Sequence, residues 1–104
     1  MNELTPQQVF ARLHEAQIVD VREAEEVAAG MIVGARHVPL SDVGAGADRL
    51  DKSRPVIAVC RSGRRSAAAA EQLASAGFTA YTMSGGMLEW EAAGLPTAAP
   101  QPAQ

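Results

Sequence analysis

The sequence predicts an α/β domain in which helices cover both faces of a mostly parallel sheet of about five short strands. Short apolar runs alternate with helical signals along the chain, which is typical of this class. The clearest run, residues 56–59, is apolar throughout, as expected for a strand that is buried on both faces. A length of 104 residues suits one domain, and 47% hydrophobic residues suffice for its core.

Capping and turn signals place the individual elements. Thr5, with Gln8 three residues later, resembles a capping box that has Pro6 at the first helical position. Gly44 and Gly46 weaken any helix between residues 41 and 50, so the structure of that segment stays open. Strands are expected at 18–21, 36–38, 56–59 and 79–83. Helices are expected at about 6–13, 23–30, 64–77 and 87–93, the last packed through Met87, Leu88 and Trp90.

Composition limits the classes of function. The net charge of -3 gives no general reason to expect nucleic acid or an anionic membrane as a partner, and no apolar run is long enough to span a bilayer. The first residues lack the pattern of a signal peptide, and a lone cysteine fits a reducing compartment. We therefore expect a soluble, cytoplasmic protein with one domain over residues 1–96 and a flexible Ala/Pro/Gln-rich tail over 97–104.

The segment around Cys60 carries the chemistry. Cys60 ends the clearest strand, where ligands bind in parallel α/β sheets, and a helix begins a few residues later. The amides and dipole at that helix N-terminus favour an anion, and Ser62 and Gly63 let the loop curl around it. Three basic side chains add positive charge: Arg61, Arg64 and Arg65. These features predict a thiol pKa below the value of about 8.5 for a free cysteine, together with a site for an anionic substrate.

A purely structural cysteine is the alternative interpretation of this segment. This interpretation does not explain why arginines stand in the first turn of a helix, where their positive charge opposes the helix dipole. Residues that are locally unfavourable in this way are typical of functional sites. Arg61 and Arg65 are expected to bind a dianion through their forked guanidinium groups, whereas no role is assigned to Arg64. Ser66 either caps the helix or donates to the sulfur, and capping is favoured.

Several motifs together resemble one family. CRSGRRS, residues 60–66, is similar to the active-site loop of rhodanese-like sulfurtransferases. VDVRE at 19–23, GARHVPL at 34–40 and SGGMLEWEAAGLP at 84–96 resemble the other motifs of that family, in the same order. The resemblance covers residues 4–96 and implies the three-layer rhodanese-like fold.

The resemblance also implies an activity. Cys60 would take a sulfane sulfur from thiosulfate or a related persulfide donor and pass it to a thiol or cyanide, without metal or cofactor. A sulfur-relay protein is a further partner that it suggests. The residues implied to bind the donor are Arg61, Ser62, Gly63, Arg64, Arg65 and Ser66.

Two other functions stay open. The first is a sulfur carrier, or a persulfide-relay or interaction module, with little thiosulfate turnover. The second is a cysteine phosphatase or arsenate reductase, which uses the same thiolate and helix N-terminus. Those phosphatases hold an arginine where this chain has Ser66, so the loop is one residue short for phosphate.

The remaining polar residues are interpreted as structural. Asp20 or Glu26 is expected to pair with Arg22 near a strand end, and His37 to have a structural hydrogen bond. Many members of the family carry His and Pro where this chain has Met31 and Val33, which predicts a local change in packing. One cysteine and two separated histidines, His14 and His37, do not have the spacing of metal ligands.

Overall fold

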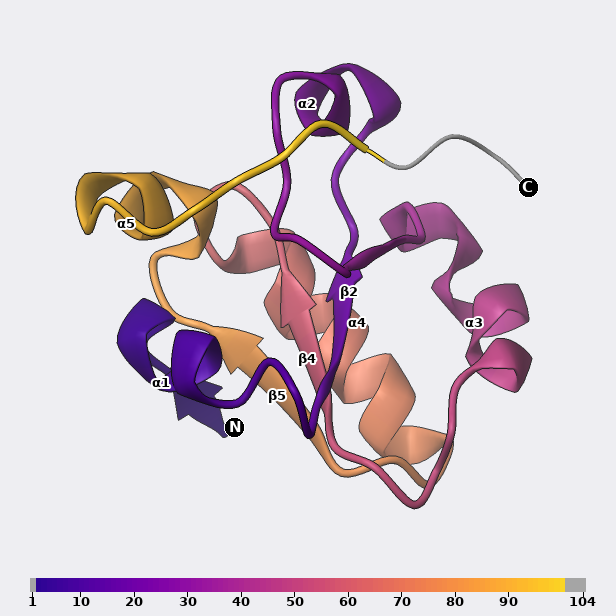
Figure 1. Ribbon diagram of the computed structural model, residues 1–104. Coiled ribbons are helices and arrows are strands. Elements are labelled where there is room, and N and C mark those ends of the chain that lie inside the picture. Colours follow the sequence, from indigo (N-terminus) through magenta and orange to yellow (C-terminus); the bar gives the residue numbers. More distant parts are fainter. Residues whose placement is uncertain (1, 101–104) are drawn as a thin grey trace.

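Five parallel strands form the central sheet, in the order β1-β5-β4-β2-β3 (Figure 1). The structure is a computed structural model that describes residues 2–100. The strands are β1 (Glu3–Leu4), β2 (Gln17–Asp20), β3 (Arg36–His37), β4 (Val56–Val59) and β5 (Ala80–Met83). This confirms the predicted α/β class and the parallel sheet.

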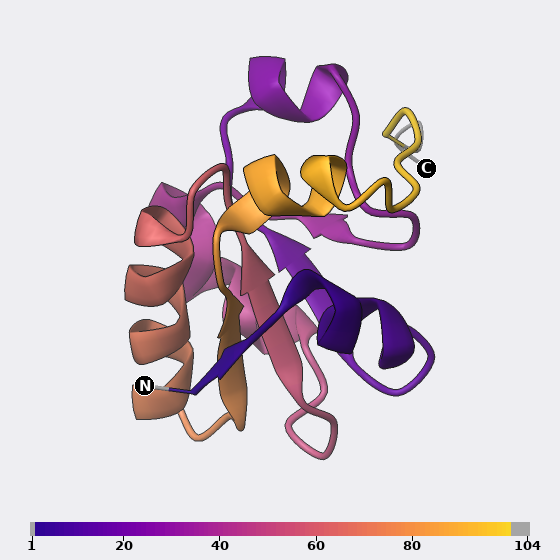
Figure 2. The ribbon, with the colours of Figure 1, turned by 90° about the vertical axis from the view of Figure 1, so that its left-hand side faces the viewer.

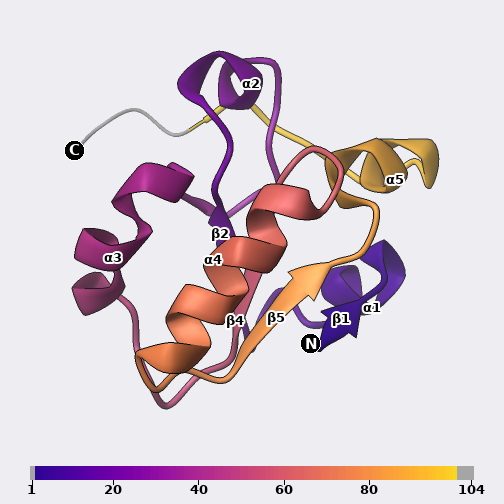
Figure 3. The same cartoon turned by 180° about the vertical axis from the view of Figure 1, so that it is seen from behind.

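The helices cover both faces of the sheet. They are α1 (Pro6–Ala11), α2 (Ala24–Ala28), α3 (Val43–Gly46), α4 (Arg64–Ser75) and α5 (Gly86–Ala92). Figure 2 shows α4 on one side of the strands and α1 with α5 on the other, and Figure 3 shows α3 beside α4. The segment around Gly44 and Gly46, for which the sequence favours no single structure, contains α3 between two 3-10 turns, Leu40–Asp42 and Ala47–Arg49.

The alternation of side chains along β4 decides where the cysteine points. Ile57 and Val59 belong to the core shared with α1 and α5. Val56, Ala58 and Cys60 belong to the core shared with α3 and α4. Because successive side chains of a strand face opposite sides of the sheet, Cys60 lies on the same side as α4, the helix that follows it.

The capping box correctly predicts the start of α1, whereas no sequence pattern predicts β1. The capping box is present: the Gln8 N–H donates to Thr5 Oγ1 over 3.1 Å, and the Thr5 N–H donates to Gln8 Oε1 over 2.8 Å. β1 was not predicted, because two residues carry no periodic pattern. It forms by pairing with β5, in the register Leu4 to Met83.

The last helix buries one face only. Met87 and Trp90 are buried, whereas Leu88 is 45% exposed. The expectation that Leu88 packs in the core is therefore wrong. Residues three apart share a face of a helix, and the next residue after Met87 turns away from it.

The chain beyond α5 returns to the loop after α2. Met31 and Ala98 exchange two backbone hydrogen bonds of 2.9 Å each, and Met31 is buried. Val33, the other departure from the family pattern, is exposed. Residues 101–104 of the predicted flexible tail lie outside the described residues. Within residues 2–100 no helix combines the length and the apolar character needed to cross a membrane.

The start of α5 holds the backbone of the cysteine loop. The Met87 N–H donates to the Cys60 carbonyl over 2.8 Å, and the Leu88 N–H donates to the Arg61 carbonyl over 3.1 Å. The close approach requires Gly86: a Cβ atom there would lie 2.5 Å from the Cys60 carbonyl oxygen, and its φ of +59° is left-handed. The two carbonyls are thereby fixed on the side facing α5.

An ion pair joins the first turn of α4 to α2. Arg65 donates two hydrogen bonds to the Glu26 carboxylate, of 2.6 and 2.9 Å. The hydrogen bond from Arg65 lowers the pKa of Glu26 to about 2, against a smaller opposing effect of burial. The pairing ties the helix that follows the cysteine to the helix that follows β2.

Replacement of Gly86 tests the contact between α5 and the loop. We expect Gly86→Ala to lower the free energy of unfolding by about 2–4 kcal/mol, because the added methyl group meets backbone atoms at a left-handed φ. Gly44→Ala is the matched control: it lies in α3 with no atom within 4 Å of an added Cβ, and it should be neutral or slightly stabilising. Urea unfolding that gives equal stabilities for the two variants would contradict the packing described.

The Glu26–Arg65 pair predicts a pH-dependent contribution to stability. At pH 7, Glu26→Gln should lower the free energy of unfolding by about 0.5–1 kcal/mol, since the pair is partly exposed. The folded-state pKa of Glu26 lies below its ordinary value of 4.5, so the contribution is present above that pH and disappears as the pH falls toward 2. The neighbouring exposed Glu25, changed to Gln, provides the control. A difference between wild type and Glu26→Gln that persists undiminished at low pH would exclude this pairing.

Candidate active site

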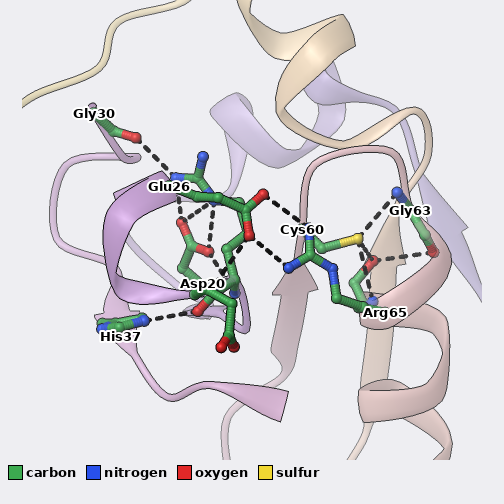
Figure 4. Close-up of polar contacts among 10 residues, drawn as sticks. Asp20, Glu26, Gly30, His37, Cys60, Gly63 and Arg65 are labelled. Carbon is green, nitrogen blue, oxygen red and sulfur yellow. Dashed lines mark hydrogen bonds and ion pairs between the residues drawn. The ribbon is translucent and has the colours of Figure 1, made fainter. Parts of the chain in front are cut away.

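The Cys60 sulfur is surrounded by donors from its own loop. Cys60 directly follows β4 and its side chain is fully buried. The Gly63 N–H donates to Sγ over 3.0 Å and the Ser66 N–H over 3.3 Å (Figure 4). Gly63 is the N-cap of α4 with a left-handed φ of +106°, which turns the loop back toward the sulfur. The predicted convergence of loop amides on Cys60 is present.

Two opposing effects set the acidity of the thiol. Burial raises the pKa of Cys60, because a buried thiolate loses its hydration. Hydrogen bonds from the Ser66 side chain and from the backbone N–H groups of Ser66, Gly63 and Ser62 lower it, and together they prevail. The pKa of Cys60 therefore lies below its ordinary value, as the sequence predicts.

Ser66 contacts the sulfur and does not cap the helix. It lies inside α4, and the capping position belongs to Gly63, which has no side chain for the purpose. In the neutral form of the site, the Cys60 thiol donates to Ser66 Oγ over 3.4 Å and Ser66 Oγ donates to the Gly63 carbonyl over 3.2 Å. The expectation that capping is the role of Ser66 is therefore wrong.

Thr82 is a site residue that the sequence analysis missed. Its Oγ1 lies 2.6 Å from Ser66 Oγ, and the residue is 3% exposed. A signal was available, since Thr82 is a polar residue inside the expected strand at 79–83. The contact with Ser66, however, depends on the packing of β5 against α4, which no local pattern specifies.

The three arginines of the loop have different environments. Arg61 and Arg64 are exposed, and neither side chain makes a hydrogen bond to another part of residues 2–100. Arg65 is engaged with Glu26, a partner that the sequence analysis did not assign to it. The two residues with unengaged guanidinium groups lie on either side of Ser62 and Gly63 in the sequence.

A separate polar network supports the end of β2. Arg22 donates to Asp20 through Nε at 2.9 Å and through Nη2 at 2.8 Å, and also to the Gly30 carbonyl at 2.8 Å (Figure 4). His37 Nε2 lies 2.8 Å from the Arg22 carbonyl oxygen. These contacts confirm the structural network predicted for Arg22, with Asp20 rather than Glu26 as its partner.

Comparison with known proteins agrees with this geometry. The model of the family described as the rhodanese-like domain matches residues 5–93. The Bacillus subtilis protein YtwF is 42% identical over 77 residues, which cover 74% of this chain and 75% of that protein. A sulfurtransferase from Allochromatium vinosum is 32% identical over 105 residues, covering 97% and 98%. The thiosulfate sulfurtransferase GlpE of Pseudomonas entomophila is 35% identical over 89 residues, covering 84% and 82%.

A solved structure shares the fold over almost the whole length. The rhodanese-related protein of Thermoplasma volcanium superimposes with a TM-score of 0.89 at 26% identity, covering 94% of this chain and 98% of that one. The match in sequence and in fold identifies the family. The chain belongs to the rhodanese-like domain family, and the general activity that its relatives indicate is sulfur transfer.

Proposed function

We propose that this protein moves a sulfane sulfur from thiosulfate, or from a related persulfide donor, to a thiophilic acceptor through a persulfide on Cys60. The Cys60 thiolate attacks the outer sulfur of thiosulfate, the bond between the two sulfurs of the donor breaks, and sulfite leaves with the electron pair. The acceptor, a thiolate or cyanide, then attacks the outer sulfur of the persulfide and the Cys60 thiolate leaves. Each half is a displacement that needs no added oxidant or reductant.

The arrangement of donors around Sγ carries this proposal. A nucleophilic thiolate has to exist near neutral pH, and the N–H groups of Gly63 and Ser66 meet the sulfur where that charge forms. The same charge forms again when Cys60 leaves in the second half of the reaction. Donors fixed at the N-terminus of α4 therefore raise the fraction of thiolate available for the first displacement and stabilise the leaving thiolate in the second.

The loop arginines divide between two roles in this proposal. Arg61 and Arg64 attract the dianionic donor, because their charges are exposed and have no carboxylate partner within residues 2–100. Arg65 ties the first turn of α4 to α2 through its ion pair with Glu26. It affects donor binding indirectly, because it holds the cysteine loop in position. Ser62, Gly63 and Ser66 contribute the hydrogen bonds to sulfur.

The name of the Pseudomonas entomophila relative supports thiosulfate as the donor. The single cysteine supports a reducing compartment, such as the cytoplasm, as the place of action. A sulfur carrier that receives its sulfur from a partner protein would use the same persulfide, so the donor has to be tested directly.

Sulfur loading is measured by the intact mass of the protein. After incubation with thiosulfate and desalting, we expect a mass gain of one sulfur atom that cyanide removes. Cys60→Ala should show no gain, because it lacks the nucleophile.

An unchanged mass for the reduced wild type would contradict thiosulfate as the donor. Loading by a persulfide donor would then identify a sulfur carrier. Hydrolysis of phosphate esters without any sulfur loading would instead favour the phosphatase alternative.

The proposed role of the exposed arginines predicts an effect on donor binding. Arg61→Ala and Arg64→Ala should each raise KM for thiosulfate about 2- to 5-fold, the value of roughly one exposed charge contact, with a smaller effect on kcat. The increase should shrink at high ionic strength. Arg49→Ala, which removes an exposed arginine in another element, is the control and should leave KM unchanged. Wild-type KM in both loop variants would contradict the role.

A further inference from the structure

The hydroxyl groups of Ser66 and Thr82 form a buried pair next to the sulfur. Ser66 is fully buried and Thr82 is 3% exposed, and their oxygens lie 2.6 Å apart. The Thr82 side chain comes from β5, in register with Ala58 of β4, and faces α4. The pair therefore joins the strand beside the cysteine to the helix that begins at its loop.

The number of hydroxyl protons and of acceptors around them indicates which of the two oxygens, Ser66 Oγ or Thr82 Oγ1, donates this hydrogen bond. Ser66 has one hydroxyl proton and three neighbours that can accept it: Thr82 Oγ1, the Gly63 carbonyl at 3.2 Å and the Cys60 sulfur at 3.4 Å. If Ser66 donates to Thr82, the proton of Thr82 has no acceptor among the hydrogen bonds of residues 2–100. If Thr82 donates to Ser66, both protons are used, and the Ser66 proton is available to the other two acceptors. A buried hydroxyl favours the arrangement that satisfies it.

When Thr82 is the donor, the Ser66 hydroxyl has two states, which differ by rotation of its O–H group. With a neutral thiol, the Cys60 S–H donates to Ser66 Oγ and the Ser66 proton points to the Gly63 carbonyl. With a thiolate, the Ser66 proton can turn to the sulfur, while Thr82 continues to donate to Ser66. A hydroxyl that accepts one hydrogen bond is a stronger donor in the next.

We propose that Thr82 is a positioning residue, which donates to the Ser66 hydroxyl and so directs the Ser66 proton to the Cys60 sulfur anion. The inference deepens the proposed function, because the same sulfur is the nucleophile and leaving group of the transfer. It concerns the protonation of Cys60 alone, so it can be tested without any sulfur donor.

The opposite direction of the hydrogen bond makes the opposite prediction. If Thr82 were the acceptor, its removal would release the Ser66 proton to the sulfur and stabilise the thiolate. If Thr82 is the donor, its removal weakens the donation from Ser66 and destabilises the thiolate. The sign of one measured shift therefore separates the two arrangements.

The experiment is a titration of the Cys60 thiol in Thr82→Val, which removes the hydroxyl at nearly constant shape. Ultraviolet absorbance of the thiolate is followed against pH, with Cys60→Ala subtracted to remove the contribution of the aromatic residues. We expect the pKa of Cys60 to rise by about 0.2–0.6 unit, the scale of cooperative strengthening in a hydrogen-bonded chain. Ser66→Ala, which removes the donor itself, should raise it by about one unit.

Three comparisons make the result specific. Thr82→Ser restores a hydroxyl and should return the pKa to the wild-type value. In a protein that already carries Ser66→Ala, Thr82→Val should not change the pKa of Cys60 further, because Thr82 acts on the sulfur through the Ser66 hydroxyl. Thr79→Val, at an exposed threonine just before β5, should leave the pKa unchanged. Should Thr82→Val not fold, as judged by circular dichroism, Thr82→Ala replaces it.

A lowered or unchanged pKa in Thr82→Val would overturn the proposal. So would a shift that persists without Ser66, since it would show a general effect of the substitution on packing. Failure of thiosulfate to load Cys60 would contradict thiosulfate as the donor. It would not change the expected pKa shifts, because the titrations use no sulfur donor. The two proposals are thus separable by experiment.

Discussion

A sulfur anion at the end of β4 has to find its hydrogen-bond donors inside the protein, because Cys60 is fully buried. Burial alone makes a thiolate less stable, and the ordinary behaviour of a buried cysteine is to stay protonated. In this site the N–H groups of Gly63 and Ser66 and the Ser66 hydroxyl lie 3.0 to 3.4 Å from the sulfur, and hydrogen bonding outweighs burial, so the pKa of Cys60 lies below its ordinary value. Much of the remaining structure can be understood as the support that keeps these donors in place.

That support comes from elements far apart in the sequence. The period of β4 puts Cys60 on the side of α4, so the sulfur faces the helix N-terminus. On the other side of the loop, α5 holds the carbonyls of Cys60 and Arg61, and only a glycine at position 86 lets it approach so closely. The Glu26–Arg65 pair fixes the first turn of α4 against α2. The N–H groups of Gly63 and Ser66 do not need to reorganise when charge appears on the sulfur, which is the main advantage of a preorganised site, and only the Ser66 hydroxyl has to turn.

The parts of this account that could be predicted from the sequence are those encoded by neighbouring residues. The capping box at Thr5, the buried strand before Cys60 and the loop between that strand and α4 all depend on local patterns, and the structure has them. The rest depends on contacts between elements. β1 forms only by pairing with β5. Arg65 pairs with Glu26 because the fold brings α2 next to the start of α4. Thr82 becomes a site residue only when β5 places it against Ser66.

The central claim is that the amides of the loop, together with Ser66, stabilise the Cys60 thiolate within the folded protein. The most direct measurement follows the amide-proton resonances of Gly63 and Ser66 by NMR as the pH is raised. We expect both resonances to shift together, as their hydrogen bonds to sulfur strengthen, with one midpoint below the value of about 8.5 for a free cysteine. A midpoint at or above that value, or resonances that do not respond when Cys60 ionises, would contradict it.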